Sequence, residues 1–516
     1  MSRADLIIAA DFGTSSVKLG VVAEGMQLRA TQVESYPVAL QSGGVAEQNP
    51  ADWWAALARG IAALEAEAPG TLSRVGALVF SAQMCGVTCV DKTGTPLRPC
   101  IIWQDIRAAS LARNLIGGFP SALGYNLGRL ARWLPIANGA PAKNGMDPIA
   151  KWHFLMREEP EVWAATHRTL DVKDWLIHRA TGRFVTTADS ANLTWLMDTR
   201  PGREGWSETL SRMTRTPLDK LPEIVDGTDV VGTLTPTAAA ELGLSADVPV
   251  VAGAGDVTAT ALGSGAVGDG ALHLCISTSA WVSGFFSRRQ LSVPHSFATV
   301  ASSAGYRPLL IATQESAGSA LEWVARLMGH GDVPDLDAAF GDVGEFREDD
   351  PFLIPWFAGE RVPVDNDALR GVIHGLSIDH DQKAVARAAL EGVALNLRWA
   401  YEAVAKKPGV QLDGPIPLVG GGASNPVLAQ LVADALGREV IIGESRHAGV
   451  LGTATLAAPM MGWDPDVWHA AARLSDRTTA RYAPLPGRRE MIERRYARLR
   501  KLRKAMVKTY AGAGHD

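Results

Sequence analysis

The chain of 516 residues exceeds the size at which a single hydrophobic core keeps growing, so we expect two domains. Its net charge of −5 provides no overall basic field, which argues against nucleic acid as the main partner. The four cysteines form no CxxC pair and no HExxH motif occurs, so neither a disulfide framework nor a zinc site is indicated. No apolar run reaches transmembrane length. We therefore expect no membrane partner and a cytoplasmic location.

The amino-terminal segment joins two apolar runs through a polar turn. Residues 6–10 and 17–22 are expected to be the strands of a β-hairpin around Asp11-Phe12-Gly13-Thr14-Ser15-Ser16. Gly13 lets the backbone approach a phosphate closely, Thr14 to Ser16 can donate hydrogen bonds, and Asp11 can face a hydrated Mg²⁺. The turn therefore predicts a nucleotide-phosphate loop.

The following sequence alternates between helix and strand signals. Asn49 and Pro50 are typical of a helix cap and first helical residue, and the helix should end near Pro69-Gly70. A strand is predicted from Val75 to Phe80, whereas the segment 116–148, rich in Gly, Asn and Pro, is expected to be irregular. A short strand then runs into a Gly-rich turn that ends at Asp256. We place the domain boundary in this strand, which gives domains of residues 1–251 and 252–516.

A second polar turn resembles the first. Residues 273–284 can be aligned with the amino-terminal hairpin so that Ser277 falls on Gly13 and Thr278-Ser279 fall on Thr14-Ser15. Cys275 then stands where the first copy has Asp11. Two related strand-turn-strand units suggest a duplicated fold that grips one phosphate chain from both halves. Chance similarity between two serine-rich turns is the alternative.

The last part of the chain completes an α/β pattern. A helix is predicted over 382–404, a buried strand over 416–419 and another helix over 426–436. Between the last two, the turn Gly420 to Asn425 can let an adenosine lie against bare backbone, and a tight turn in which Ser424 or Asn425 caps the helix fits equally well. The basic segment 488–508 keeps a helical spacing of apolar residues, which favours a surface helix with one packed face.

Eight motifs follow one another along the chain. They are Asp11 to Lys18, Gln83-Met84-Cys85-Gly86, Trp103 to Arg107, Lys173-Asp174-Trp175-Leu176, Gly253-Ala254-Gly255-Asp256, Pro355 to Arg361, Arg370-Gly371-Val372 and Gly420 to Asn425. Together they resemble the FGGY family of carbohydrate kinases in the actin-like ATPase superfamily, most nearly its xylulose kinases. The resemblance implies two ribonuclease-H-like α/β domains with ATP and sugar in the cleft between them, and transfer of the γ-phosphoryl group of ATP to a sugar hydroxyl.

The resemblance also implies roles for individual residues. Phosphoryl transfer needs positioning, charge neutralisation and a base for the attacking hydroxyl. Asp256 matches the family's catalytic base, with a helix-capping Asp as the alternative, and Asp11 matches the carboxylate that orients Mg²⁺. The residues that match ATP contacts are Gly13, Thr14, Ser15, Lys18, Ser277, Thr278, Ser279, Gly421, Gly422 and Asn425. ATP and Mg²⁺ are thus the expected cofactors and a small sugar the partner, and a homodimer is one option for the oligomeric state.

The sugar site matches the family less completely. The expected sugar contacts are Gln83, Met84, Cys85, Trp103, Asp105, Asp256 and Val257. Xylulose kinases usually have His where this chain has Cys85 and Asn where it has Val257. Because these polar groups would read sugar hydroxyls, their absence predicts weak use of xylulose or a preference for another ketose, a polyol or a sugar acid. A catalytically silent sugar-binding protein is a further alternative, against which the retention of Asp11 and Asp256 argues.

The two turns make a testable pair. If they hold the same phosphate oxygens, Thr14→Ala and Thr278→Ala should each raise the KM for ATP, and their effects should not add in the double variant. Steady-state ATP kinetics of the three variants measure this coupling. Unchanged ATP kinetics with additive losses of thermal stability would reduce both turns to ordinary hairpin connections.

Overall fold

The computed structural model describes residues 4–331 and 335–511, and the chain forms two compact units. The first unit contains Met1–Gly263, Val300–Leu309 and Gly449–Leu474, and the second contains Ser264–Thr299, Leu310–Ala448 and Ser475–Asp516. Each unit is built from three separate stretches of the chain. The single domain boundary expected after residue 251 therefore stays a prediction. Within the described ranges, no helix is long and apolar enough to cross a membrane.

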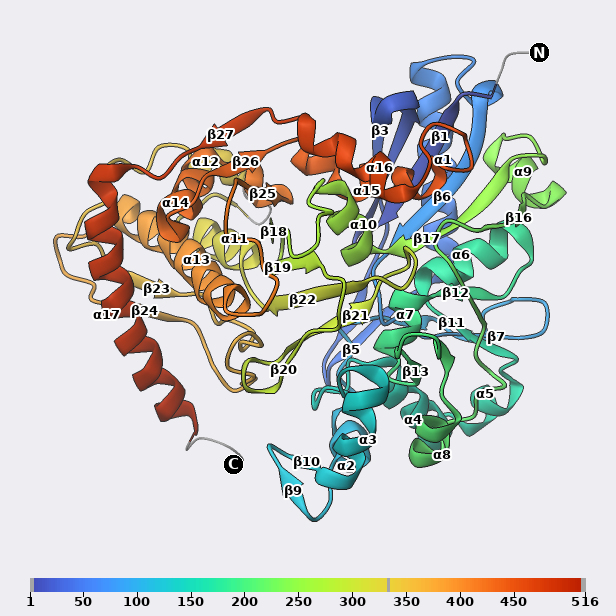
Figure 1. The fold of residues 1–516 in the computed structure, drawn as a ribbon, viewed down its shortest axis with the longest axis horizontal. Coiled ribbons are helices and arrows are strands. Elements are labelled where there is room, and N and C mark those ends of the chain that lie inside the picture. The colour runs from blue at the N-terminus through green and yellow to red at the C-terminus, as the bar shows by residue number, and fades with distance from the viewer. Residues whose placement is uncertain (1–3, 332–334, 512–516) are drawn as a thin grey trace. The chain divides into compact units, whose positions relative to one another are not determined.

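The first unit is organised around a six-stranded sheet (Figure 1). Its strands run in the spatial order β16-β17-β6-β1-β2-β3. They are β1 (Leu6–Phe12), β2 (Ser16–Ala23), β3 (Gln27–Ser35), β6 (Val75–Ala82), β16 (Val230–Thr233) and β17 (Pro249–Gly255). Strand β1 pairs antiparallel with β2 and parallel with β6, which in turn pairs parallel with β17. The predicted hairpin and the predicted strand from Val75 are thereby confirmed.

Sequence signals explain how the helices of the first unit begin. Helix α1 (Pro50–Glu67) starts after Asn49, whose side chain accepts a hydrogen bond from the Ala51 N–H, as predicted. Helix α6 (Val172–Thr181) starts with a capping box made by Asp171 and Asp174. Helix α4 (Pro148–Glu158) has a proline at its first position. Helix α10 (Asp256–Gly263) begins directly after β17.

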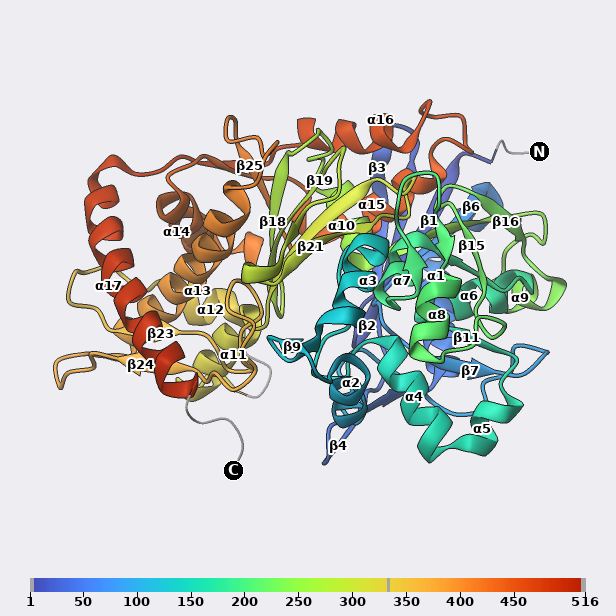
Figure 2. The same ribbon diagram turned by 60° about the horizontal axis from the view of Figure 1, so that its bottom comes forward.

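A late segment of the chain packs beside the first strands. Helix α15 (Ala448–Ala457) lies close to β1 in both ribbon views (Figures 1 and 2), and helix α16 (Val467–Ala472) packs against α10. Small residues make this approach possible, because a Cβ at Gly20 would overlap the Val450 side chain and a Cβ at Gly449 would overlap the Asp11 carboxylate. The chain therefore returns, after more than 400 residues, to the end of its first strand.

The segment 116–148 is more regular than predicted. It contains the short strands β9 (Ser121–Ala122) and β10 (Tyr125–Asn126) and the helix α3 (Leu127–Ala137). The Asn126 side chain caps this helix at its start, Asn138 ends it in a left-handed conformation, and Trp133 is fully buried. Caps at both ends and a buried face thus outweigh Pro135 inside the helix, and the expectation of an irregular segment was wrong for these residues.

The second unit repeats the strand order of the first. Its eight-stranded sheet follows the order β20-β21-β22-β19-β18-β25-β26-β27. The strands are β18 (Leu272–Ile276), β19 (Ala280–Phe285), β20 (Leu291–Ser292), β21 (Phe297–Ala301), β22 (Pro308–Gln314), β25 (Ile416–Val419), β26 (Val440–Ile442) and β27 (Ala480–Tyr482). The run β22-β19-β18-β25-β26 corresponds to β3-β2-β1-β6-β17, and in both the first hairpin encloses three turn residues. This correspondence is the expected duplicated arrangement.

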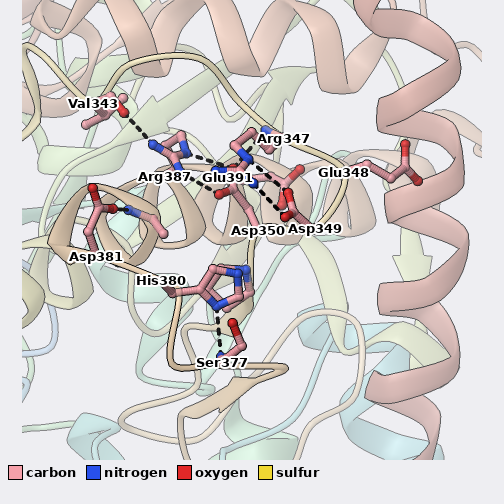
Figure 3. Close-up of polar contacts among 12 residues, drawn as sticks. Val343, Arg347, Glu348, Asp349, Asp350, Ser377, His380, Asp381, Arg387 and Glu391 are labelled. Atoms are coloured by element: carbon pink, nitrogen blue, oxygen red, sulfur yellow. Dashed lines mark hydrogen bonds and ion pairs between the residues drawn. The ribbon is translucent and has the colours of Figure 1, made fainter.

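Buried ion pairs attach the outer segments of the second unit to its longest helix. Helix α13 (Gln382–Ala405) carries Arg387, whose guanidinium lies between the Val343 carbonyl and the Asp350 carboxylate (Figure 3). Glu391, one turn further, accepts hydrogen bonds from Arg495 of helix α17 (Pro486–Ala511). Ile492, Tyr496 and Leu499 of α17 are buried, so the basic segment is a helix with one packed face, as predicted.

Helix α14 (Pro426–Leu436) and strand β25 match their predicted bounds.

One buried group gives stability a pH dependence that can be measured. His273 in β18 is fully buried, and neither ring nitrogen has a hydrogen-bond partner in the part of the chain that the structure describes. Burial lowers its pKa to about 3. Between that value and the unfolded value of about 6.5, the unfolded chain binds the proton and the folded chain does not, so this histidine makes stability fall as pH falls. His273→Leu should reduce the slope of unfolding free energy against pH, by up to about 1.4 kcal/mol per pH unit in that window.

The measurement is urea unfolding at several pH values between about 4 and 6.5. His374→Leu is the matched control, because His374 also lies in a strand, β24 (Val372–His374), but is exposed. Equal slopes in wild type and His273→Leu would show that His273 does not titrate as its burial requires.

Candidate active site

The ends of three neighbouring parallel strands bring the predicted catalytic residues of the first unit together. Phe12 at the end of β1 pairs with Ala82 at the end of β6, and Ala82 pairs with Gly255 at the end of β17. Asp11 lies just before the end of β1, and Asp256 follows β17 directly. Because the carboxyl ends of adjacent parallel strands share one edge of a sheet, these side chains lie at a place where α/β folds bind ligands.

Asp11 is held by hydroxyl groups from two distant segments. The Ser81 hydroxyl donates to Asp11 Oδ1 at 2.7 Å, and the Thr453 hydroxyl donates to Ser81 Oγ at 2.6 Å. Lys18 is the register partner of Asp11 across the β1–β2 hairpin. Burial raises the pKa of Asp11, and the Ser81 hydrogen bond and the Lys18 charge oppose part of that rise. Asp11 is thus an oriented carboxylate in a site with few charges to compensate it.

Asp256 is the first residue of α10 and follows a strand end that is itself anchored. The Gly255 N–H donates to Asp189 Oδ2 at 2.8 Å, and the Thr187 hydroxyl donates to the other oxygen of the same carboxylate at 2.6 Å. Burial raises the pKa of Asp256 to about 8, the negative charge of Asp11 adds to the rise, and the Val257 N–H opposes it. Asp256 therefore has the high proton affinity that a general base requires.

The turn at residues 13–15 is fixed from behind. The Tyr36 hydroxyl donates to the Gly13 carbonyl at 2.5 Å, and the Gln48 amide donates to the Thr14 carbonyl at 2.7 Å. The Trp103 indole N–H donates to Thr14 Oγ1 at 3.0 Å. Since the Thr14 oxygen is the acceptor in that contact, its own O–H can still donate to a ligand. Ser15 is exposed at the tip of the turn.

The residues after β6 lie beside Asp256 and include a buried atom without a partner. The Gln83 amide donates to Gln48 Oε1 at 2.7 Å, but Gln83 Oε1 is buried and has no hydrogen-bond partner among the described residues. A Cβ at Gly255 would overlap the Met84 side chain, so Met84 packs directly against the strand end that carries Asp256. A buried carbonyl oxygen without a donor is costly unless a ligand or water supplies one. Gln83 Oε1 is therefore suited to accept a hydrogen bond from a hydroxyl of a bound sugar.

The other predicted sugar residues differ in what they can offer. Cys85 and Val257 are partly exposed, as is Trp103. Asp105 is 1% exposed and already accepts hydrogen bonds from the Ala46 N–H, the Arg107 N–H and the Arg107 guanidinium. These contacts tie the segment after β8 (Cys100–Ile101) to β5 (Val45–Gln48). The role of Asp105 as a sugar contact stays a prediction.

In the second unit, the turn at residues 277–279 is supported by a helix start. The Ala317 N–H and the Ser319 hydroxyl donate to the Thr278 carbonyl at 3.1 and 3.0 Å, and the Gly318 N–H donates to the Ser277 carbonyl at 2.8 Å. These donors belong to the first turn of α11 (Gly318–Leu327) and the residue before it. Thr278 itself is exposed and Ser279 partly exposed, so the hydroxyl groups of the turn face outward from a fixed backbone.

The three glycines that begin the turn after β25 have different environments. Side chains at Gly420 and Gly422 would overlap the Ile276 carbonyl and side chain, whereas a Cβ at Gly421 would meet nothing within 4 Å. Gly421 is therefore the glycine with open space in front of its backbone. Asn425 Oδ1 accepts from the Leu428 N–H at 2.9 Å, which confirms it as the cap of α14. The contacts of Gly421, Gly422 and Asn425 with adenosine stay predictions.

Several residues that build the first-unit site were not found from the sequence. They are Gln48, Ser81, Lys151, Asp171 and Asp189, all buried or nearly so and all hydrogen-bonded to a predicted loop. None lies in a motif with a known spacing, although Asp171 stands two residues before the Lys173 motif. Only the fold reveals them, because their partners are distant in sequence.

The donor set suits a metal ion that keeps much of its water. In residues 4–331 and 335–511, no group of three or more His, Cys, Asp or Glu side chains could hold a metal. Mg²⁺ is usually held by one or two carboxylates together with substrate phosphates and waters. Asp11, with Gly449 passing close to it and leaving no side chain in the way, fits such an open site.

Comparison with known proteins assigns this site to a family. The sequence profile of the FGGY family of carbohydrate kinases, N-terminal domain, matches residues 6–263, and that of the C-terminal domain matches residues 276–461. The chain therefore belongs to the FGGY family, and it is an ATP-dependent carbohydrate kinase with the actin-like ATPase fold.

Within the family, the chain is similar to several proteins named xylulose kinase. A xylulose kinase from Escherichia coli (strain K12) is 32% identical over 507 residues, which are 96% of this chain and 99% of that protein. The structure of a protein described as a xyloylose kinase from Brucella ovis has a TM-score of 0.85 and 25% identity, over 98% of this chain and 100% of that one. A ligand-bound xylulose kinase from Lactobacillus acidophilus has the same TM-score at 21% identity, over 99% and 100% of the two chains.

Asp256→Asn separates the catalytic role from the capping role. Asn caps helices as well as Asp does, so a residue that only capped α10 could be replaced without loss of activity. If Asp256 accepts the hydroxyl proton, we expect kcat to fall by roughly 10²–10⁴-fold with nucleotide affinity nearly unchanged. Steady-state kinetics and nucleotide titration measure the two quantities. A variant that keeps more than a tenth of the activity would remove Asp256 from this role.

Proposed function

We propose that the chain transfers the γ-phosphoryl group of ATP to a hydroxyl of D-xylulose or a closely related ketopentose, with Mg²⁺ as the metal ion. The observation that carries this proposal is that Asp256 and Gln83 follow the paired strand ends Gly255 and Ala82, and that the buried Gln83 Oε1 has no hydrogen-bond partner among the described residues. One group is suited to accept a proton from a hydroxyl and the other to accept a hydrogen bond from a second hydroxyl.

Each part of the reaction has a residue suited to it. Asp256 would take the proton of the attacking hydroxyl, and its high proton affinity matches that task. The N–H and O–H groups of the turn at 13–15 would donate to phosphate oxygens, and Lys18 would add positive charge near Asp11. Asp11 would hold Mg²⁺, whose charge neutralises the phosphates. Gly421 would allow adenosine to approach the backbone in the second unit.

The relatives support xylulose as the acceptor over the alternatives. Proteins named xylulose kinase match almost the whole chain both in sequence and in structure. A gluconokinase and a glycerol kinase also match the chain, but a xylulose kinase is 32% identical over 96% of it, against 26% over 87% for the gluconokinase, so the alternatives are not favoured. The departures at Cys85 and Val257 then predict weaker discrimination among ketopentoses, because two hydroxyl-reading groups are replaced. The proposal places the enzyme in the cytoplasm, where ATP is available, and leaves its oligomeric state open.

Restoring the two polar side chains tests the acceptor. Cys85→His combined with Val257→Asn should raise the ratio of kcat/KM for D-xylulose over other ketopentoses by roughly 5- to 150-fold, which corresponds to about 1–3 kcal/mol of added discrimination. The measurement is kcat/KM for the wild type and the double variant across ketopentoses, polyols and sugar acids.

Three outcomes would count against parts of this account. A wild type that phosphorylates a polyol or a sugar acid better than any ketopentose would overturn the proposed acceptor. A wild type that already discriminates strongly in favour of xylulose would show that other residues, such as Gln83, hold the hydroxyls. A uniform loss for every sugar in the double variant would mean a damaged pocket and no new hydroxyl contact.

A further inference from the structure

A single peptide group in the candidate sugar loop is held by two side chains, the buried Lys151 and the partly exposed Asp171. The Lys151 ammonium of α4 donates to the Cys85 carbonyl at 2.7 Å, and the Gly86 N–H donates to Asp171 Oδ1 at 2.7 Å. The Cys85 carbonyl and the Gly86 N–H belong to the same peptide bond. In a trans peptide these two groups point in opposite directions, so the two side chains grip the peptide from its two sides.

The charges of the two side chains match the dipole of the peptide. An ammonium group faces the carbonyl oxygen and a carboxylate faces the N–H, and both contacts are partly shielded from solvent, which strengthens electrostatic interactions. A flipped peptide would turn its oxygen toward the carboxylate and its N–H toward the ammonium. The pair therefore selects one orientation of the Cys85–Gly86 peptide and disfavours the other.

The backbone of this loop needs such support. Cys85 has a φ of +65°, a left-handed conformation that costs energy in any residue with a side chain. Gly86 has no room for a side chain, because a Cβ there would lie 2.8 Å from Asp171 Oδ1. Packing does not close the site fully either, since a cavity of about 20 Å³, near the room of one water molecule, lies beside Gly86, Trp152 and Asp171. The hydrogen bonds from Lys151 and to Asp171 must therefore supply the support for this loop that packing does not.

The same lysine also reaches the second predicted sugar segment. Lys151 is 1% exposed, and its ammonium donates to the Ile102 carbonyl at 2.9 Å, directly before Trp103. One buried cation thus fixes the backbone next to Met84 and the backbone next to Trp103. Asp105 and Asp147 are the acidic groups near it, while Asp174 and the Ser190 hydroxyl face Asp171. Of the described residues around Lys151 and Asp171 that these contacts and charges involve, only Cys85 and Asp105 are also predicted to contact sugar or ATP.

We propose that Lys151 and Asp171 are positioning residues that set the sugar-binding conformation of the loop Gln83–Gly86 by clamping the Cys85–Gly86 peptide. The role rests on the proposed function, because it assigns this loop to the acceptor sugar. Loss of either side chain should weaken sugar binding and leave the ATP site unchanged, since neither residue contacts the turn at 13–15 in the described hydrogen bonds.

The kinetic test compares Lys151→Met and Asp171→Leu with wild type. Both variants should raise the KM for D-xylulose by roughly 10-fold or more, as expected for the loss of charged hydrogen bonds that hold the loop, and change the KM for ATP by less than about 2-fold. Asp171→Asn keeps an acceptor oxygen for the Gly86 N–H and should retain a KM for xylulose near that of wild type. Lys151→Gln, which still donates a hydrogen bond, replaces Lys151→Met if the latter fails to fold.

A second readout needs no catalysis. Cys85 is partly exposed, whereas Cys89, Cys100 and Cys275 are buried, so iodoacetamide should modify Cys85 selectively. Without the Lys151 or Asp171 contact, the Cys85–Gly86 peptide should be held less firmly. The alkylation rate of Cys85 should therefore change by several-fold in both Lys151→Met and Asp171→Leu. Peptide mass spectrometry measures this rate in the absence of any sugar or nucleotide.

A matched control removes a buried cation elsewhere. Arg387→Met deletes the ion pair with Asp350 in the second unit (Figure 3), far in sequence from the loop, and should lower thermal stability without changing the alkylation of Cys85. A Lys151→Met protein with lower stability, unchanged KM for xylulose and unchanged alkylation would overturn the proposal. If wild type instead prefers another acceptor, the proposed sugar is wrong, and the alkylation rates still decide whether the clamp exists.

Discussion

The site depends on the alignment of three parallel strand ends at one edge of the first sheet. The register that pairs Phe12 with Ala82 and Ala82 with Gly255 fixes where the following residues begin. Glycines allow this alignment: Gly253 has a φ of +75° and would overlap the Phe80 carbonyl with any side chain, and Gly255 leaves space for Met84. A carboxylate from one strand end, an amide from the next and a second carboxylate from the third thereby come to share one small region.

Bringing two carboxylates to that region has an electrostatic cost. The charge of Asp11 adds to the burial that raises the pKa of Asp256, and the Lys18 charge lowers the pKa of Asp11. Hydroxyl and N–H donors from Ser81 and Val257 compensate only part of this cost. The fold therefore holds two carboxylates close together, at a cost that a bound cation would lower.

Local patterns predicted the elements, and the fold supplied the connections between them. The hairpins, the helix capped by Asn49, the strand Ile416–Val419 and the helix Pro426–Leu436 follow from hydrophobic runs and caps, which depend on neighbours in the sequence. The supporting residues Ser81, Lys151 and Asp171 could not be predicted, because each acts on a loop 66 to 85 positions away. The helix Leu127–Ala137 was missed because its proline and flanking glycines masked caps at both ends.

The most direct test of the account is the stoichiometry of transfer. Wild-type protein would be incubated with ATP, Mg²⁺ and D-xylulose, with ADP measured enzymatically and the sugar phosphate by phosphorus NMR. The account predicts one sugar phosphate for each ADP and almost no ADP when the sugar is left out, since the attacking hydroxyl must come from the acceptor. ADP accompanied by inorganic phosphate at equal rates with and without sugar would contradict it.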